Sequence, residues 1–166
     1  MKSTARFAGH PIHPMLIPYP FAFLSGAAAF DAASVARGNE RFGQTASHLR
    51  TAGIASALVA ALPGLIDYFT TVPEGRAKET ATRHMLSNLS ALGCFGAAAW
   101  AANGRRVPNG AALAFELIGT ALLSVGGWLG GSLSYHHQVG VDPEERRPLA
   151  APSESGASRR EFTTTT

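Results

Sequence analysis

Cysteine is nearly absent from the sequence, since Cys94 is the only one in 166 residues. A single cysteine excludes an intramolecular disulfide, a cysteine-rich zinc knuckle, a cysteine-bound iron–sulfur cluster and a Cys-x-x-Cys-His haem attachment. A phosphate-binding glycine loop, a nucleophile elbow and a His-Glu-x-x-His motif are missing as well. The glycine-rich residues 126–131 follow no strand pattern, so we interpret them as helix packing. We therefore expect a protein that is not an enzyme on its own.

Lysine and arginine are absent from four long stretches, which lie between Arg6 and Arg37, Arg50 and Arg76, Arg83 and Arg105, and Arg106 and Arg146. Each stretch can hold the ~20 apolar residues that cross ~30 Å of hydrocarbon. The formal net charge is +3, and the cations flank the apolar stretches. This placement is typical of membrane anchoring and argues against nucleic-acid binding.

The pattern predicts an all-α integral membrane protein, an antiparallel four-helix bundle with a disordered C-terminal tail. An N-terminal segment, residues 1–14, contains the His-Pro-Ile-His-Pro motif. The transmembrane domain covers 15–138, with spans at about 17–36, 49–72, 82–102 and 110–135. Residues 139–166 are too polar to order themselves. We interpret the first span as retained, because Asp31 interrupts it and no signal-cleavage site follows it.

A soluble four-helix bundle is the alternative fold, and it would need one polar stripe on every helix. The third segment carries no charged residue from Met85 to Gly104, and the fourth carries only Glu116 between Val107 and Val141. These segments favour the membrane fold, with a lipid bilayer as the surrounding partner.

Five of the six histidines lie at segment ends that share one membrane face, and these are His10, His13, His84, His136 and His137. Imidazole binds haem and metal ions, so we expect a site at this face. His84 is the best ligand candidate because it leads directly into a span. His13 follows, since its flanking prolines predict an extended, restrained pose. His136 and His137 are adjacent, so only one of them can easily face inward.

The most concrete hypothesis is a b-type haem, ligated by His84 with His13 or His137 and serving electron transfer. The alternative cofactor is a divalent metal ion held by His10, His13, Asp67 and His84. Asn88 and Tyr135 would then orient the ligands together with Asp67.

Asp31 and Glu116 form a second polar layer in the other half of the predicted bundle. They suggest a proton path or a carboxyl pair that shares a proton, or else a structural hydrogen bond between the first and fourth helices. On the fourth segment a polar stripe is expected to face inward, and it comprises Glu116, Thr120, Ser124, Gly127, Gly131 and Tyr135. The glycine pairs 126/130 and 127/131 indicate close helix packing, either within the bundle or in a homo-oligomer.

Several of these motifs together resemble a bacterial family of transmembrane proteins, domain of unknown function 2231. The resemblance rests on residues 9–18, Phe30-Asp31, residues 64–68, His84 with Asn88, residues 126–131 and Tyr135. It implies a multi-pass protein of the inner membrane. Some relatives carry a Rieske-type iron–sulfur domain, which implies redox chemistry. This chain has no cysteines for such a cluster, so a separate redox partner would be needed.

A non-catalytic subunit that binds a partner is the alternative function, and a proton-coupled transport component is a weaker one.

Overall fold

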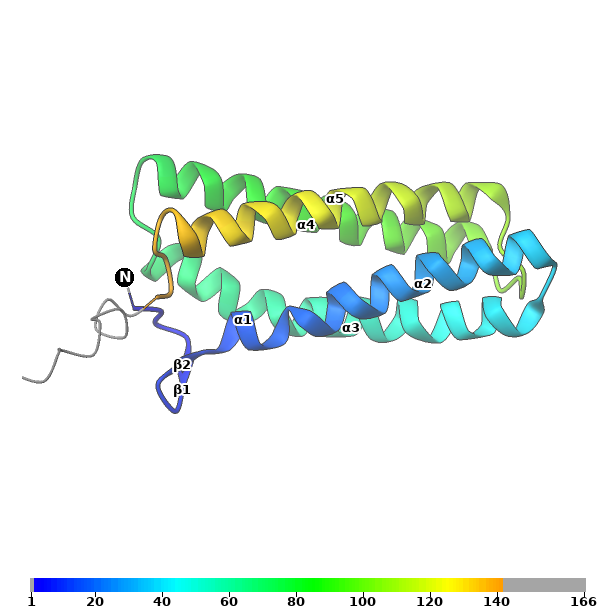
Figure 1. Ribbon diagram of the computed structural model, residues 1–166, viewed down its shortest axis with the longest axis horizontal. Helices are drawn as coiled ribbons and strands as arrows, with labels where there is room; N and C mark the ends of the chain where they lie inside the picture. The colour runs from blue at the N-terminus through cyan, green and yellow to red at the C-terminus, as the bar shows by residue number, and fades with distance from the viewer. Residues whose placement is uncertain (1, 142–166) are drawn as a thin grey trace, which may run out of the picture.

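The computed structural model describes residues 2–141, which form a bundle of four long antiparallel helices (Figure 1). The elements in chain order are β1 (Arg6–Phe7), β2 (His10–Pro11), α1 (Ile12–Leu16), α2 (Pro18–Arg37), α3 (Glu40–Thr70), α4 (Arg76–Ala102) and α5 (Gly110–Tyr135). The two short strands pair antiparallel, with Arg6 opposite Pro11. Most of the tail predicted to be disordered, 142–166, lies outside the described residues.

Four segments of the described chain are long and apolar enough to cross a membrane, and they run over Ile12–Arg37, Glu40–Thr70, Arg76–Ala102 and Gly110–Tyr135. Large apolar side chains cover the outside of the bundle; Trp100 and Trp128, for example, are 83% and 78% exposed. Helices that are apolar on their outer faces suit a lipid environment. The prediction of an all-α membrane protein is therefore confirmed.

Local sequence signals explain where the helices begin and end. Pro18 occupies the first turn of α2, where its missing N–H leaves no bond unmade. Asn39 and Asn109 cap α3 and α5, because their side chains accept hydrogen bonds from backbone amides of the first turn. Gly38, with φ of 60°, ends α2 in the left-handed conformation that glycine adopts readily.

Two helices begin earlier than the sequence predicted. The second was expected at about 49 but α3 begins at Glu40, and the third was expected at about 82 but α4 begins at Arg76. The polar residues that open these helices were mistaken for loops, although only Gly38 and Asn39 separate α2 from α3. As a result Arg50 lies about 15 Å inside α3, at 1.5 Å per residue, instead of at its start.

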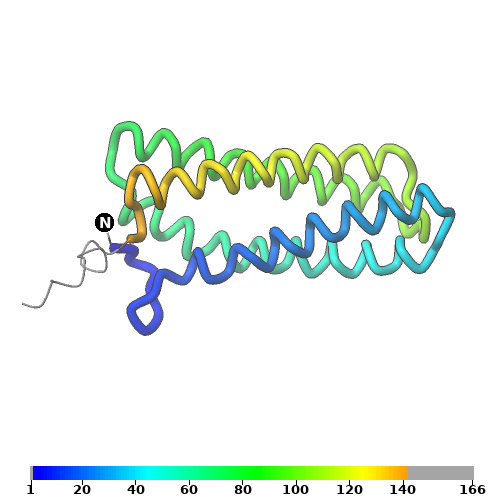
Figure 2. The backbone as a smooth tube through the Cα atoms, in the orientation of Figure 1, coloured from blue at the N-terminus to red at the C-terminus, as the bar shows by residue number. Residues whose placement is uncertain are grey.

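The bundle consists of two helical hairpins laid against each other. The α2 helix packs chiefly on α3, and α4 packs chiefly on α5, while narrower contacts join α2 to α5 and α3 to α4 (Figure 2). A small apolar core of Leu24, Ala91, Phe95 and Leu123 lies where the hairpins meet. Within the first hairpin, Gly53 of α3 permits the close approach of α2, since a Cβ there would lie 2.5 Å from a Leu24 methyl carbon.

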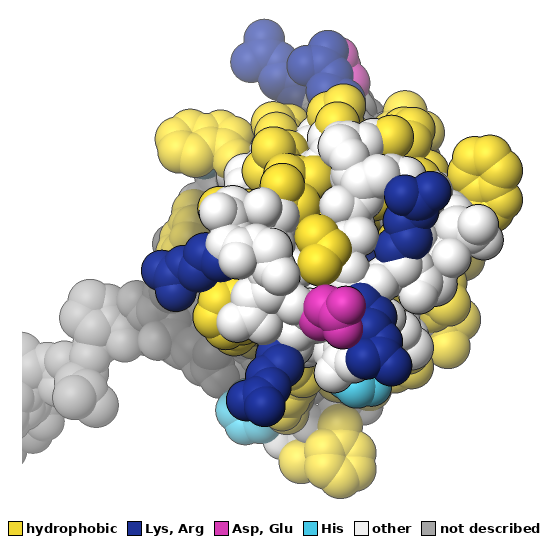
Figure 3. Space-filling view, turned by 90° about the vertical axis from the view of Figure 1, so that its right-hand side faces the viewer, with side chains coloured by type: hydrophobic (Ala, Val, Ile, Leu, Met, Phe, Trp, Pro, Cys, Tyr) yellow, Lys and Arg dark blue, Asp and Glu magenta, His cyan; other side chains and the backbone are white. Residues whose placement is uncertain are grey.

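The two ends of the bundle differ in character. The N-terminal segment, the α3–α4 loop and the end of α5 share one end, which holds the His13–His84 pair described below (Figure 1). The α2–α3 turn and the α4–α5 loop form the other end. Figure 3 looks onto that second end, where basic side chains are spread over the surface and apolar side chains appear at its rim.

Candidate functional site

Two of the five clustered histidines face each other across the junction of the two hairpins. The rings of His13 and His84 have centroids 6.2 Å apart and planes at 89°. His13 belongs to α1, which packs on α3, whereas His84 lies two turns inside α4. The prediction of an extended pose for His13 was wrong, because Ile12 and His13 begin a short helix with Pro14 in its first turn, where proline is tolerated.

Both histidines are anchored in the same way. His13 Nδ1 lies 2.8 Å from the Ala60 carbonyl oxygen, and His84 Nδ1 lies 2.8 Å from that of Gly126. A carbonyl oxygen only accepts hydrogen bonds, so each Nδ1 carries the hydrogen and each neutral ring keeps its lone pair on Nε2. Histidines that ligate metals usually donate their second nitrogen to a carbonyl or a carboxylate in this manner.

Glycines make room for both rings. A Cβ at Gly64 would lie 2.9 Å from the His13 ring, and one at Gly130 would lie 3.0 Å from His84 Cε1. At Gly126 a Cβ would lie 2.6 Å from the Asn88 amide oxygen. Gly126 and Gly130 therefore serve packing within the chain. A homo-oligomer contact through glycines, the other alternative, would have to use Gly127 and Gly131.

Asn88 lies one turn after His84 on α4 and contacts it. Its Nδ2 donates to the His84 carbonyl oxygen at 2.9 Å and lies 3.3 Å and 3.4 Å from the two ring nitrogens. Near-equal distances to both nitrogens indicate that the amide lies over the face of the ring. Asn88 therefore restrains the ring without occupying the lone-pair direction of Nε2.

The other predicted ligands lie elsewhere. His10 is exposed in the β1–β2 hairpin, and His136 is exposed after the end of α5. His137 Nε2 lies 3.2 Å from Thr80 Oγ1, one turn before His84 on α4. In residues 2–141 no group of three or more His, Cys, Asp or Glu side chains could hold a metal ion. The four-residue metal set is therefore not assembled.

Asp67 was expected to orient a histidine, but it holds the N-terminal segment instead. Its carboxylate accepts hydrogen bonds from Ser3 Oγ at 2.7 Å and from the Thr4 amide at 2.9 Å. It also accepts from the Ala5 amide and from Thr71 Oγ1. Because the segment leads through the hairpin to α1, these bonds anchor the chain that positions His13.

Of the inward stripe predicted on α5, Glu116 is buried, and Thr120 and Gly131 are half-buried. Ser124 and Gly127 are exposed, and Tyr135 is 77% exposed, so Tyr135 orients no ligand. The predicted positions advance mostly by four residues, more than the 3.6 residues per turn of a helix, so the stripe drifts around the axis. The buried residues alternate steps of four and three, and they are Ala112, Glu116, Gly119, Leu123 and Gly126.

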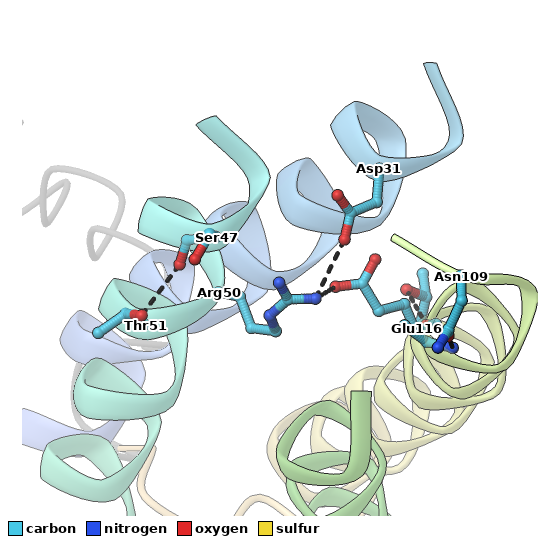
Figure 4. Close-up of polar contacts among 8 residues, drawn as sticks. Asp31, Ser47, Arg50, Thr51, Asn109 and Glu116 are labelled. Atoms are coloured by element: carbon cyan, nitrogen blue, oxygen red, sulfur yellow. Dashed lines mark hydrogen bonds and ion pairs between the residues drawn. The ribbon is translucent and has the colours of Figure 1, made fainter. Parts of the chain in front are cut away.

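The second polar layer is a buried ionic triad. Arg50 Nη1 lies 3.0 Å from Asp31 Oδ2 and 2.5 Å from Glu116 Oε1 (Figure 4). The residues are 5%, 1% and 0% exposed, respectively. The structure thus joins Asp31 and Glu116, but it does so through an arginine that the sequence reasoning placed at the membrane surface. The sequence signal for it is the helical spacing of the small residues Gly43, Ala46 and Gly53, since Arg50 falls on the same face.

Comparison with known proteins identifies one family. The family model described as "Predicted membrane protein (DUF2231)" matches residues 9–143, most of the chain. No curated protein and no solved structure matches. The matched region includes both the histidine pair and the ionic triad.

Proposed function

The chain belongs to the DUF2231 family of membrane proteins, and we propose that it is a b-type haem protein of the inner membrane in which His13 and His84 bind the iron. The spacing of the two rings is the observation that carries the proposal. Two imidazoles bound to opposite sides of one metal, with bonds of ~2.0–2.1 Å, have ring centroids about 6 Å apart. The rings of His13 and His84 are 6.2 Å apart.

The number of ligands favours haem over a divalent ion. Structural and catalytic zinc sites use three or four protein ligands, whereas haem supplies four nitrogens itself and needs two axial bases. Only two imidazoles converge here, and no third metal-binding side chain joins them within residues 2–141. Of the two partners that the sequence left open for His84, His13 is the one in this proposal.

The surrounding residues prepare the two imidazoles for this role. The carbonyls of Ala60 and Gly126 hold the hydrogens on Nδ1, so both Nε2 atoms are available as ligands. Gly64 and Gly130 let the rings pack directly against the backbones of α3 and α5, where a Cβ would clash with them. When bound, haem supplies one-electron redox chemistry, and a separate redox partner would exchange electrons with the protein.

The test is a spectrum of the full chain, expressed with added haem precursor and purified in detergent. We expect a b-type absorption spectrum in the oxidised and reduced protein, and a highly anisotropic low-spin EPR signal that reflects the perpendicular imidazoles. His13→Ala and His84→Ala should each abolish the low-spin signal. The matched controls His10→Ala and His137→Ala should keep it.

A folded wild-type protein that takes up no haem would overturn the proposal. The same result would favour the alternative function, a membrane subunit that binds a partner. In that case the two histidines serve only to join the hairpins. Their replacement by alanine would then lower thermal stability or partner recovery without changing cofactor content.

A further inference from the structure

The Asp31–Arg50–Glu116 triad carries unbalanced charge inside membrane-spanning helices. Two carboxyl groups share one guanidinium, so full ionisation leaves one negative charge among residues that are at most 5% exposed. Glu116 lies six residues from the start of α5, and Asp31 lies six residues from the end of α2, a depth of roughly 9 Å. An uncompensated charge at such a place is strongly unfavourable, and one proton would remove it.

The oxygen atoms indicate where that proton resides. Asp31 Oδ2 and Glu116 Oε1 both accept from Arg50 Nη1. Glu116 Oε2 is buried and has no hydrogen-bond partner in the described structure. A buried carboxylate oxygen without a donor is unfavourable, whereas protonation of the carboxyl group removes its charge.

The neighbours of Glu116 on each packed helix support this placement. Asp31 faces it from α2 and adds like charge, while Arg50 faces it from α3. On α4, Phe95 is buried nearby and Cys94 lies against Gly119, one turn along α5. The single cation is therefore shared between two acids.

A cavity connects the triad to the end of the bundle. It measures about 170 Å³, and Arg50 is the one member of the triad in its lining. The rest of the lining includes Ser47 and Thr51 of α3, Ala99 and Ala102 of α4, and Gly104–Arg106 of the α4–α5 loop. Figure 4 shows Ser47 and Thr51 beside the arginine. The volume and polar lining suit several water molecules.

We propose that Glu116 is a proton-binding site that exchanges its proton with water in the cavity beside Arg50. A hydronium ion in the cavity gives its proton to the Glu116 carboxylate and becomes water, and the triad changes from one net negative charge to neutral. The reverse step returns the proton to the same end of the bundle. The site is independent of the haem proposal, because Glu116 and Gly130 are about 21 Å apart along α5.

Infrared spectroscopy of the full chain in lipid nanodiscs tests the proposal. At neutral pH we expect the carbonyl stretch of one protonated carboxylic acid, which carboxylates do not show. The band should shift in D₂O. It should disappear in Glu116→Gln and persist in the exposed control Glu79→Gln. Asp31→Asn should weaken the band, because Arg50 then balances the charge of Glu116 alone.

Carboxyl-¹³C labelling keeps the test valid if Glu116→Gln does not fold. In the wild-type protein, labelled glutamate should move the band and labelled aspartate should not. The proposal is overturned if no protonated band appears, or if the band follows labelled aspartate. A band that does not shift in D₂O overturns the exchange with the cavity. If the band is absent and sodium raises the thermal stability of the protein, the ion bound at the triad is a metal cation and not a proton.

Discussion

Replacement of Arg50 by methionine tests the energetics of the ionic triad. Methionine preserves the apolar part of the side chain and removes the charge that Asp31 and Glu116 share. Both acids are at most 1% exposed, so each loses a charged hydrogen bond that water entering from the cavity beside position 50 replaces only in part. Removal of one partner from a buried ion pair typically costs about 3–5 kcal/mol, and we expect a loss of that size. It corresponds to a change of roughly a hundredfold to several thousandfold in the unfolding equilibrium.

The assay is reversible unfolding in mixed micelles, followed by circular dichroism. Arg41→Met is the matched control, because Arg41 is exposed on the same helix, and we expect its effect to stay within about 0.5 kcal/mol. The triple variant Arg50→Met/Asp31→Asn/Glu116→Gln removes all three charges and should recover much of the loss. If Arg50→Met is as stable as Arg41→Met, the buried triad does not stabilise the fold and the reasoning fails.

Three further predictions concern close contacts elsewhere. Gly43→Ala should destabilise by about 1–3 kcal/mol in the same assay, because its Cβ would lie 1.7 Å from the Arg106 carbonyl oxygen; Gly96→Ala, with open space around it, should be neutral or stabilising. Gly130→Ala should lower haem occupancy in the absorption assay by pressing on the His84 ring, while Gly131→Ala should not; equal occupancy would contradict the proposed site. Asp67→Asn should release the N-terminal segment and increase its cleavage in limited proteolysis, because the amide cannot accept all the bonds that the carboxylate accepts; unchanged cleavage would argue against this anchor.

The sequence by itself determined the membrane fold and the end of the bundle at which His13 and His84 lie. Only helices and closed barrels satisfy every backbone group in a bilayer, and the long stretches without lysine or arginine show no sustained alternation of the kind that barrel strands need, so they are helical. Alternation of such spans then places both the start of the first helix and the start of the third on one side. His13 and His84 are therefore at the same end before any packing is known.

Tertiary structure decided which side chains meet, because contact depends on where each helix begins and how it is rotated. The α1 turn and the Asp67 anchor select His13 over His10 as the partner of His84. The early start of α3 carries Arg50 from the expected surface to the interior, between two acids on other helices. A single residue turns a helix face by about 100°, so hydropathy locates a helix well while its inward face emerges only from packing.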